Sequence, residues 1–156
     1  MWRSRLTRLG LALVLFGWAS SLWGQTAVLD RRVDLPRVGG VALGDSAAAV
    51  LAALGEPQHR QQSLGLRFWD YPRLGISLTW DKDDARVRVI VLSAPRAGEV
   101  EGVRVGDSVV VLRSRWGSPA RVRQTGRFLD FVRHGWTCTA EVRQGRVVEI
   151  TLLLEG

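Results

Sequence analysis

The chain carries the stretch GVALGDSAAAVLAALGEP at residues 40–57 and repeats it 62 positions later as GVRVGDSVVVLRSRWGSP, at residues 102–119. Both copies have the same Gly-Val, Gly-Asp-Ser, Gly and Pro in the same places. After a two-residue deletion the match continues downstream at an offset of 60, with ten further identities. A match over this length indicates a duplicated structural module. We therefore predict two repeats, at residues 40–98 and 99–156.

Each repeat begins with a predicted helix. Ser46 and Ser108 stand where an N-cap is expected, because a serine hydroxyl accepts a hydrogen bond from the free N–H groups of a first helical turn. Gly55 and Gly117 come at the other end, each with Pro two residues later, a pattern that ends a helix. The two predicted helices span residues 47–54 and 109–116.

Three strands are predicted after each helix. In the second strand, Ile76, Leu78 and Trp80 alternate with polar residues, and a period of two indicates one buried and one wet face. The expected fold class is α+β: two tandem repeats, each a helix followed by a three-stranded antiparallel meander, with the helices packed on one face of the sheet. The expected strands are 64–71, 76–80 and 86–93 in the first repeat and 127–132, 136–140 and 146–154 in the second.

The first 24 residues are typical of an export signal. Three arginines precede an apolar stretch at 9–18, and small residues follow before Gly24. This stretch is shorter than the roughly 20 residues that cross a bilayer. We predict a signal peptide at 1–24, cleaved after Gly24 or Ala27, an N-terminal arm or linker at 25–39, and an exported chain, periplasmic or secreted, without a transmembrane helix.

The charge of the chain is moderate and uneven. Loss of residues 1–24 removes three arginines and no acids, which lowers the formal charge from +7 to +4. This is too low for a dedicated nucleic-acid binder, so no nucleic acid is expected as a partner. Residues 102–156 hold nine basic and five acidic residues, and Arg121, Arg123 and Arg127 lie close together among them. The second repeat is the electropositive half.

No residue constellation predicts catalysis. The Gly-Asp-Ser stretches are similar to the nucleophile block of some esterases, but His59 and His134 occupy positions that are not equivalent in the two repeats. A serine nucleophile needs a base held beside it, so we interpret Ser46 and Ser108 as helix caps. Zinc spacing and phosphate-binding loops are missing from the sequence. We expect no enzyme activity, catalytic residue, metal or cofactor.

Three further features are interpreted as structural. Asp81, Asp83 and Asp84 form a polar hairpin turn rather than a calcium loop, since the other ligands of such a loop are missing. Cys138 aligns with an apolar strand position and is expected to be a buried hydrophobe. Asp70 with Arg73, and Asp130 with Arg133, recur across the turn between the first two strands, where we expect them to pair.

The pattern Gly-x-Ser, an apolar residue four positions on, Gly-x-Pro and then an aromatic strand resembles the SmpA/OmlA family of small envelope lipoproteins, the BamE-like superfamily. In its tandem arrangement the chain also resembles β-lactamase inhibitor proteins. The resemblance covers nearly all of residues 40–154. It implies a protein-binding role in the cell envelope. The chain departs from the lipoproteins in lacking a cysteine after the signal and in being doubled.

The function expected from the sequence is that of an exported, non-enzymatic protein-binding module of the cell envelope, acting as scaffold or inhibitor on an envelope or extracellular protein. The alternative is a secreted protein that binds a small anionic ligand or a surface polymer. The oligomeric state is left open. For the aromatic candidates, burial in the core is the competing interpretation. The candidate binding residues are Trp69, Tyr71, Phe131, Arg121, Arg123 and Arg127.

Overall fold

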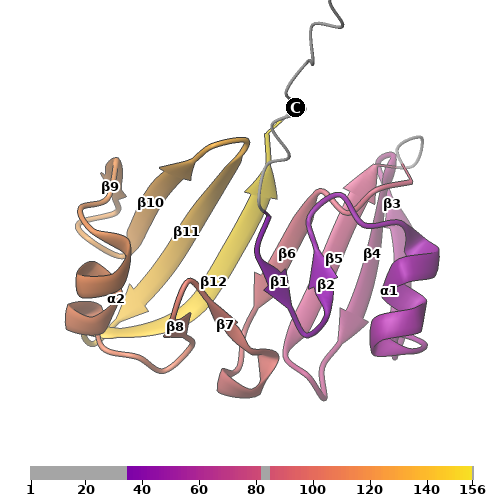
Figure 1. Cartoon of the computed structure of the whole chain (residues 1–156), viewed down its shortest axis with the longest axis horizontal. Helices are drawn as coiled ribbons and strands as arrows, with labels where there is room; N and C mark the ends of the chain where they lie inside the picture. The colour runs from indigo at the N-terminus through magenta and orange to yellow at the C-terminus, as the bar shows by residue number, and fades with distance from the viewer. Residues whose placement is uncertain (1–34, 82–84, 156) are drawn as a thin grey trace, which may run out of the picture. The chain divides into compact units, whose positions relative to one another are not determined.

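The computed structural model describes residues 35–81 and 85–155 (Figure 1). The predicted signal peptide at 1–24 lies outside the described residues, as do residues 25–34 of the predicted arm and residues 82–84 of the predicted polar turn.

Within the described residues, eight strands form one antiparallel sheet (Figure 1). Neighbouring strands pair in an order that places the first repeat in one half and the second repeat in the other. In spatial order, the strands are β3 (His59–Ser63), β4 (Leu66–Tyr71), β5 (Ile76–Asp81), β6 (Val89–Leu92), β12 (Arg146–Leu154), β11 (Trp136–Arg143), β10 (Phe128–Arg133) and β9 (Arg121–Arg123).

Two short hairpins and two helices of eight residues accompany the sheet in the described part of the chain. One hairpin and one helix belong to each repeat. The first hairpin starts inside the stretch that we interpreted as an arm or linker. The elements are β1 (Arg37–Val38), β2 (Val41–Ala42), α1 (Ala47–Leu54), the 3-10 turn η1 (Pro95–Ala97), β7 (Glu99–Val100), β8 (Val103–Arg104) and α2 (Val109–Trp116).

The expected fold class of two tandem helix-plus-three-strand repeats is wrong. Each repeat contributes four strands to the large sheet, and the two repeats share that sheet. The additional strands, β3 and β9, are exposed along their whole length, so they lack the apolar alternation by which strands are recognised. The sequence HRQQS of β3 therefore gave no strand signal.

The two repeats meet at β6 and β12, which pair about a local two-fold axis. Ile90 lies opposite Leu152 and Leu92 lies opposite Ile150, while Val91 lies opposite its own equivalent, Thr151. β6 and β12, the last strands of the two repeats, thus pair with each other, and neither remains an open edge of its half of the sheet. The duplication produces one continuous core rather than two small ones.

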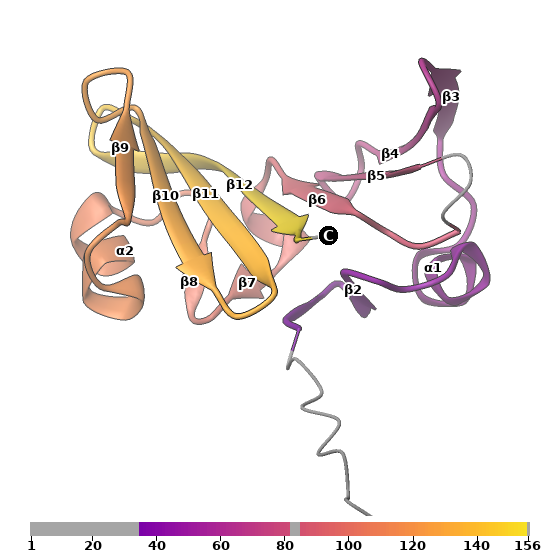
Figure 2. The same cartoon turned by 90° about the horizontal axis from the view of Figure 1, so that it is seen from above.

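Both helices lie on the same face of the sheet, together with the two hairpins (Figure 2). We call this the inner face and the opposite side the outer face. Apolar side chains from all six central strands point to the inner face and are buried there, in one cluster with Val50 of α1 and Leu112 of α2. The outer face carries the alternate residues of the same strands, most of which are partly exposed.

The Gly-Asp-Ser stretch lies between the hairpin and the helix of each repeat. Its backbone also forms hydrogen bonds with a valine at or just before the start of the last strand of that repeat. Gly44 N–H donates to the carbonyl of Val87, and Val87 N–H donates back to the carbonyl of Asp45. Gly106, Asp107 and Val147 form the same pair of bonds in the second repeat. Gly44 and Gly106 have φ of +82° and +101°, a region that favours glycine. The repeated motif is therefore a backbone junction.

Candidate binding surface on the outer face

The two serines are helix caps, as predicted. Ser46 Oγ accepts a hydrogen bond from the backbone N–H of Ala49 at 3.2 Å, and Ser108 Oγ accepts one from Val111 at 3.3 Å. The aspartate before each serine closes the preceding turn, because Asp45 accepts from the N–H of Ala42 at 2.9 Å. Asp107 does the same for Arg104 at 2.8 Å. All four side chains thus accept hydrogen bonds from backbone N–H groups and stabilise the local fold.

In the part of the chain that the structure describes, no cluster of three or more His, Cys, Asp or Glu side chains has the arrangement of a metal site. None of the described helices has the length and hydropathy of a membrane span. Cys138 is 1% exposed, as predicted, and burial raises the pKa of its thiol. A buried thiol with a raised pKa is a weak nucleophile.

The aromatic candidates lie on the inner face. Trp69 is 8% exposed, and Tyr71 and Phe131 are 1% exposed. Trp69 packs edge-on against Trp80, and Phe131 packs edge-on against Trp116 of α2. These rings hold the helices and the sheet together and offer little surface to a partner.

The arginine candidates lie at the β9 edge of the sheet. Arg123 makes a bidentate ion pair with Asp130, at 2.8 and 2.9 Å. Arg127 binds Glu141, and its guanidinium carbon lies 5.2 Å from the ring centre of Phe128. The structure brings the arginines together along β9 and the start of β10, and separates them from the three aromatic candidates.

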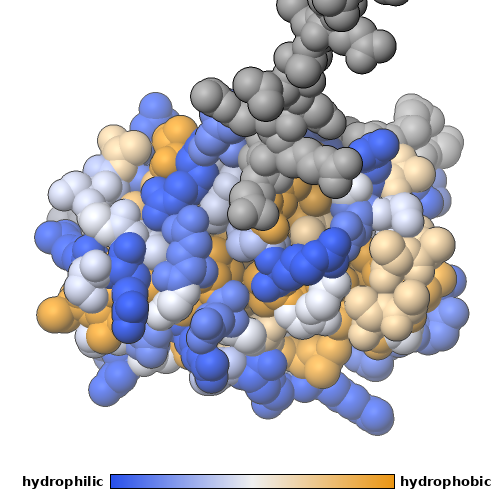
Figure 3. Space-filling model, in the orientation of Figure 1, coloured by the Kyte–Doolittle hydropathy of each residue, from blue (hydrophilic) through white to orange (hydrophobic). Residues whose placement is uncertain are grey.

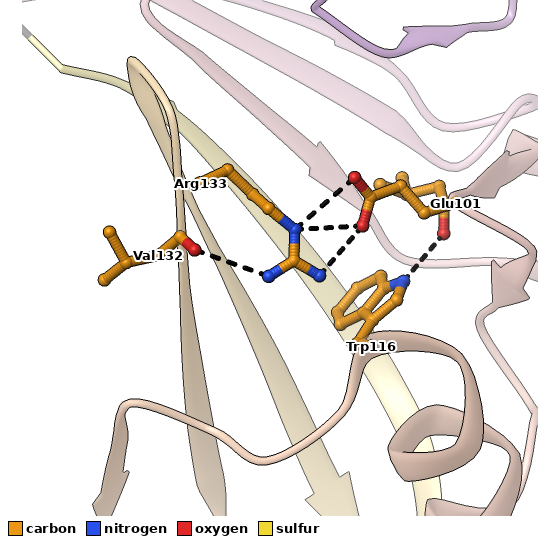
Figure 4. A network of polar contacts seen from close by, with 5 residues as sticks. Glu101, Trp116, Val132 and Arg133 are labelled. Carbon is orange, nitrogen blue, oxygen red and sulfur yellow. Dashed lines mark hydrogen bonds and ion pairs between the residues drawn. The ribbon is translucent and has the colours of Figure 1, made fainter.

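The predicted pairing of Asp130 with Arg133 is wrong. Asp130 points to the outer face, where it accepts hydrogen bonds from Arg123 and from Thr139 Oγ1. Arg133 belongs to the opposite, inner face of β10, since it alternates with Asp130 in the same way as buried Phe131. Its guanidinium binds Glu101 in the β7–β8 turn at 2.9–3.4 Å (Figure 4). Period-two geometry separates residues three apart on a strand. In the first repeat, no hydrogen bond or ion pair joins Asp70 and Arg73, both of which are described.

The outer face exposes apolar side chains over the second repeat. Leu153 on β12 is 45% exposed and Val132 on β10 is 59% exposed. Both lie beside Thr137 of β11, since Thr137 pairs with Leu153 on one side and with Val132 on the other. Half-buried Val89 continues this row on β6, opposite Leu153. We call Val89, Leu153, Thr137 and Val132 the outer apolar row.

A small pocket adjoins the outer apolar row. Its volume is about 280 Å³, and Val132 and Thr137 line it together with Arg121, Asp130 and Ala120. Arg121 lies opposite Asp130 on β9 and is exposed. Within the described residues its guanidinium has no hydrogen-bond partner. The pocket thus combines an apolar wall with a guanidinium that faces Asp130 but makes no hydrogen bond within the described residues.

Sequence reasoning missed Val132 and Leu153. The signal was present in the run Leu152, Leu153 and Leu154, because an antiparallel strand with one wet face does not need three consecutive leucines. The middle leucine must face away from the core.

Comparisons with known proteins give fold neighbours only. A scan against models of protein families found no match, and no curated protein matches the sequence. The described fold is similar to that of a cysteine-rich secretory protein from Staphylococcus aureus, at 7% identity and a TM-score of 0.57, over 72% of this chain and 44% of that one. Two further neighbours have lower scores: an extracellular protein containing an SCP domain from Bacillus anthracis (12% identity, TM-score 0.48, 72% and 44% covered) and a DUF4309 family protein from Bacillus subtilis (16%, 0.46, 71% and 79%).

The resemblance to SmpA/OmlA envelope domains and to β-lactamase inhibitors is corrected by this result, since the neighbours belong to other families. Its motif consisted of a helix cap, a helix stop and a turn, which many unrelated folds use. This chain spans less than half of the length of the S. aureus and B. anthracis proteins.

Proposed function

We propose that the chain is a non-enzymatic recognition domain of an exported protein, and that it binds a protein partner through the outer apolar row and the adjoining Arg121 pocket. The neighbours are named as secretory or extracellular proteins, which supports export. The observation that carries the proposal is the pair of exposed side chains, Leu153 and Val132, on a sheet face that no described element covers.

The partner's chemistry follows from the surface. Leu153 and Val132 offer an apolar contact, and Arg121 of the adjoining pocket offers a guanidinium without a hydrogen-bond partner among the described residues. Arginine at the rim of an apolar patch is a frequent component of protein interfaces. The complementary surface is an apolar side chain next to a carboxylate.

The test is site-specific photocrosslinking in the cells that produce the protein. A photoreactive amino acid at position 132 is expected to give a discrete protein adduct. The same amino acid at Val110, which is 72% exposed on α2, serves as the matched control and is expected to give none. Leu153→Glu should remove the adduct, because a buried carboxylate opposes an apolar contact. Equal adducts at 132 and 110, or an adduct insensitive to Leu153→Glu, would contradict the proposal.

Arg121→Glu separates the charged part of the contact from the apolar part. We expect it to weaken the adduct and to remove its dependence on salt, because a rim charge acts mainly through screened electrostatics. An unchanged salt dependence would show that Arg121 is not part of the interface.

A further inference from the structure

A second charged site lies at the far end of the same strands. Glu141 on β11 is 7% exposed and is the one charged residue that is buried among the described residues. Its Oε1 accepts hydrogen bonds from Arg127 Nε at 2.8 Å and from Arg143 Nε at 2.7 Å. Both contacts lower the pKa of Glu141, the bond from Arg127 more than that from Arg143. One carboxylate thus fixes two guanidinium groups side by side.

The two arginines line a surface cavity of about 560 Å³. Two turns form its remaining walls: the β9–β10 turn, with Thr125 and Gly126, and the β11–β12 turn, with Gln144 and Gly145. Val142 also lines it. The cavity lies where β10 and β11 are joined to their neighbours, at the opposite end of these strands from Val132 and Leu153.

The guanidinium groups retain donors. A guanidinium has five N–H donors, and Arg143 commits only its Nε to Glu141. Arg127 commits Nε and Nη2. Both Nη groups of Arg143 and Nη1 of Arg127 have no protein acceptor within the described residues. Arg143 and Arg127 side chains are 59% and 45% exposed, so a ligand can reach them.

The local charge is positive. Arg146 pairs with Arg143 in register across the turn, and its guanidinium donates to the backbone carbonyl of Gly106 at 3.0 Å. Glu149 lies opposite Glu141 on β12. Glu141 and Glu149 balance the two arginines that line the cavity, and Arg146, which follows the lining residue Gly145, adds one positive charge next to it. A singly charged anion balances it.

The first repeat lacks this arrangement. Arg67 is the equivalent of Arg127, but the residue across from it is Trp80, and the guanidinium carbon lies 5.4 Å from that ring centre. Thr79 takes the place of Glu141 in the register. The scaffold therefore does not require two arginines on one buried carboxylate.

We infer that the cavity between Arg127 and Arg143 is an oxyanion-binding site for a singly charged group with paired oxygens, a phosphodiester or a carboxylate. Guanidinium forks bind such groups through two parallel N–H···O bonds. Glu141 orients the forks before the ligand arrives, which lowers the entropy cost of binding. This site stands independently of the outer apolar row.

The experiment is an NMR titration of the full chain with dimethyl phosphate and, separately, with sodium acetate, each compared with sodium chloride at equal ionic strength. Binding is expected to shift the backbone amides of Gly126, Gln144 and Gly145 with a saturable dependence. Saturation by dimethyl phosphate alone assigns the site to phosphodiesters, and saturation by acetate alone assigns it to carboxylates. Shifts no larger than those in chloride, in both titrations, would overturn the inference.

Two variants test the residues. Arg143→Gln should weaken binding about tenfold or more, because a charge-assisted pair is lost. Arg73→Gln in the first repeat is the matched control and should bind as the wild type does. Glu141→Gln keeps an Oε1 acceptor that can orient both guanidinium groups and removes only the competing negative charge, so it should tighten binding. If Glu141→Gln weakens binding while its spectrum shows a folded chain, or Arg143→Gln has no effect, the assignment is wrong.

Discussion

The two repeats share a backbone plan but hold their helices by different means. In the first repeat the anchor comes from the sheet: Tyr71 Oη donates to the carbonyl of Gly55, which ends α1, at 3.0 Å. In the second repeat the equivalent of Tyr71 is Phe131, which has no hydroxyl. There the anchor comes from the helix, because Trp116 Nε1 donates to the carbonyl of Val100 on β7 at 3.1 Å (Figure 4).

The bulky core side chains also come from different elements in the two repeats. Trp69 and Trp80 fill the first repeat from the sheet, whereas the second repeat has the smaller Leu129 and Val142 at the corresponding places and fills space with Trp116 from the helix. The surfaces diverge as well: the exposed side of α1 is alanine, seen as the pale apolar surface at the right of Figure 3, while α2 exposes Arg113 and Arg115. Duplicated modules can therefore keep one fold while core volume moves between layers.

The largest expected effect comes from removing the helix anchor of the second repeat. Trp116 is 6% exposed and packs on Phe131, so Trp116→Ala should lower the free energy of unfolding by about 3–5 kcal/mol. Its equivalent, Leu54, is only half-buried, and Leu54→Ala should cost roughly 1–2 kcal/mol. Urea unfolding followed by circular dichroism measures both. Equal losses would show that the two helices are anchored alike.

The hairpins offer the next test. Glu101 adopts φ of +46° in the β7–β8 turn, where the first repeat has Gly39 at +59°. Glu101→Ala and Glu101→Gly both lose the contact with Arg133, but glycine tolerates this backbone. We expect Glu101→Gly to be more stable than Glu101→Ala by about 1 kcal/mol, measured by urea unfolding.

The reverse change in the first repeat should be costly. A Cβ at Gly39 would lie 3.0 Å from Ile76 Cδ1, so Gly39→Glu combines the strained φ with crowding. If Gly39→Glu proved as stable as the wild type, the two hairpins would tolerate the same residues at this position, and the first hairpin would not require glycine there.

Much of the local structure was predictable because it depends on neighbouring residues. Capping serines, stop glycines and the alternation in β5 act within a few positions, and the helix bounds and most strand positions followed from them. The edge strands were not predictable, since β3 is polar on both sides. The pairing of β6 with β12 was also hidden, because any two apolar strands satisfy the same alternation.

Register was the third hidden quantity. The sequence alignment matches Cys138 to Leu78, but Cys138 lies between Phe131 and Leu152 in the sheet, as Ile76 lies between Tyr71 and Leu92. β11 is thus displaced by two residues relative to β5. A shift of two keeps every side chain on its face, so no hydrophobic pattern reveals it. The burial of the aromatic candidates was also not predictable. Composition identified the arginines, but whether Trp69 and Phe131 face the core or solvent depends on which face of the sheet the helices cover.

The helix caps test where the repeats should behave alike. Ser46→Ala and Ser108→Ala each remove one hydrogen bond to a first-turn N–H, at 3.2 and 3.3 Å, and each should cost about 1 kcal/mol. The measurement is the urea midpoint of each variant. A cost confined to one repeat would mean that the shared Gly-Asp-Ser junction does not perform the same task twice.

The smallest expected effect concerns Asp130, whose diagonal neighbour on β9 is Arg123, while the first repeat has the uncharged Gln61 at that position. The hydrogen bond from Arg123 holds the pKa of Asp130 below its ordinary value, against the effect of burial and with help from Thr139. A lowered carboxyl pKa stabilises the fold fully above the unfolded value near pH 4, and this contribution is lost as the pH falls through the folded pKa.

Replacing Arg123 with Gln should therefore move the Asp130 pKa upward, as measured by ¹³C NMR of its side-chain carboxyl. The stability difference between Arg123→Gln and the wild type should also narrow as the pH falls below about 4, because protonated Asp130 no longer favours a guanidinium. Gln61→Glu in the first repeat is the control, since it lies outside this pair and should leave the Asp130 titration unchanged. An Asp130 pKa that did not rise in Arg123→Gln would mean that Thr139 and the backbone, which lie within the strands rather than at the edge, set its protonation, and the electrostatic distinction between the two sheet edges would disappear.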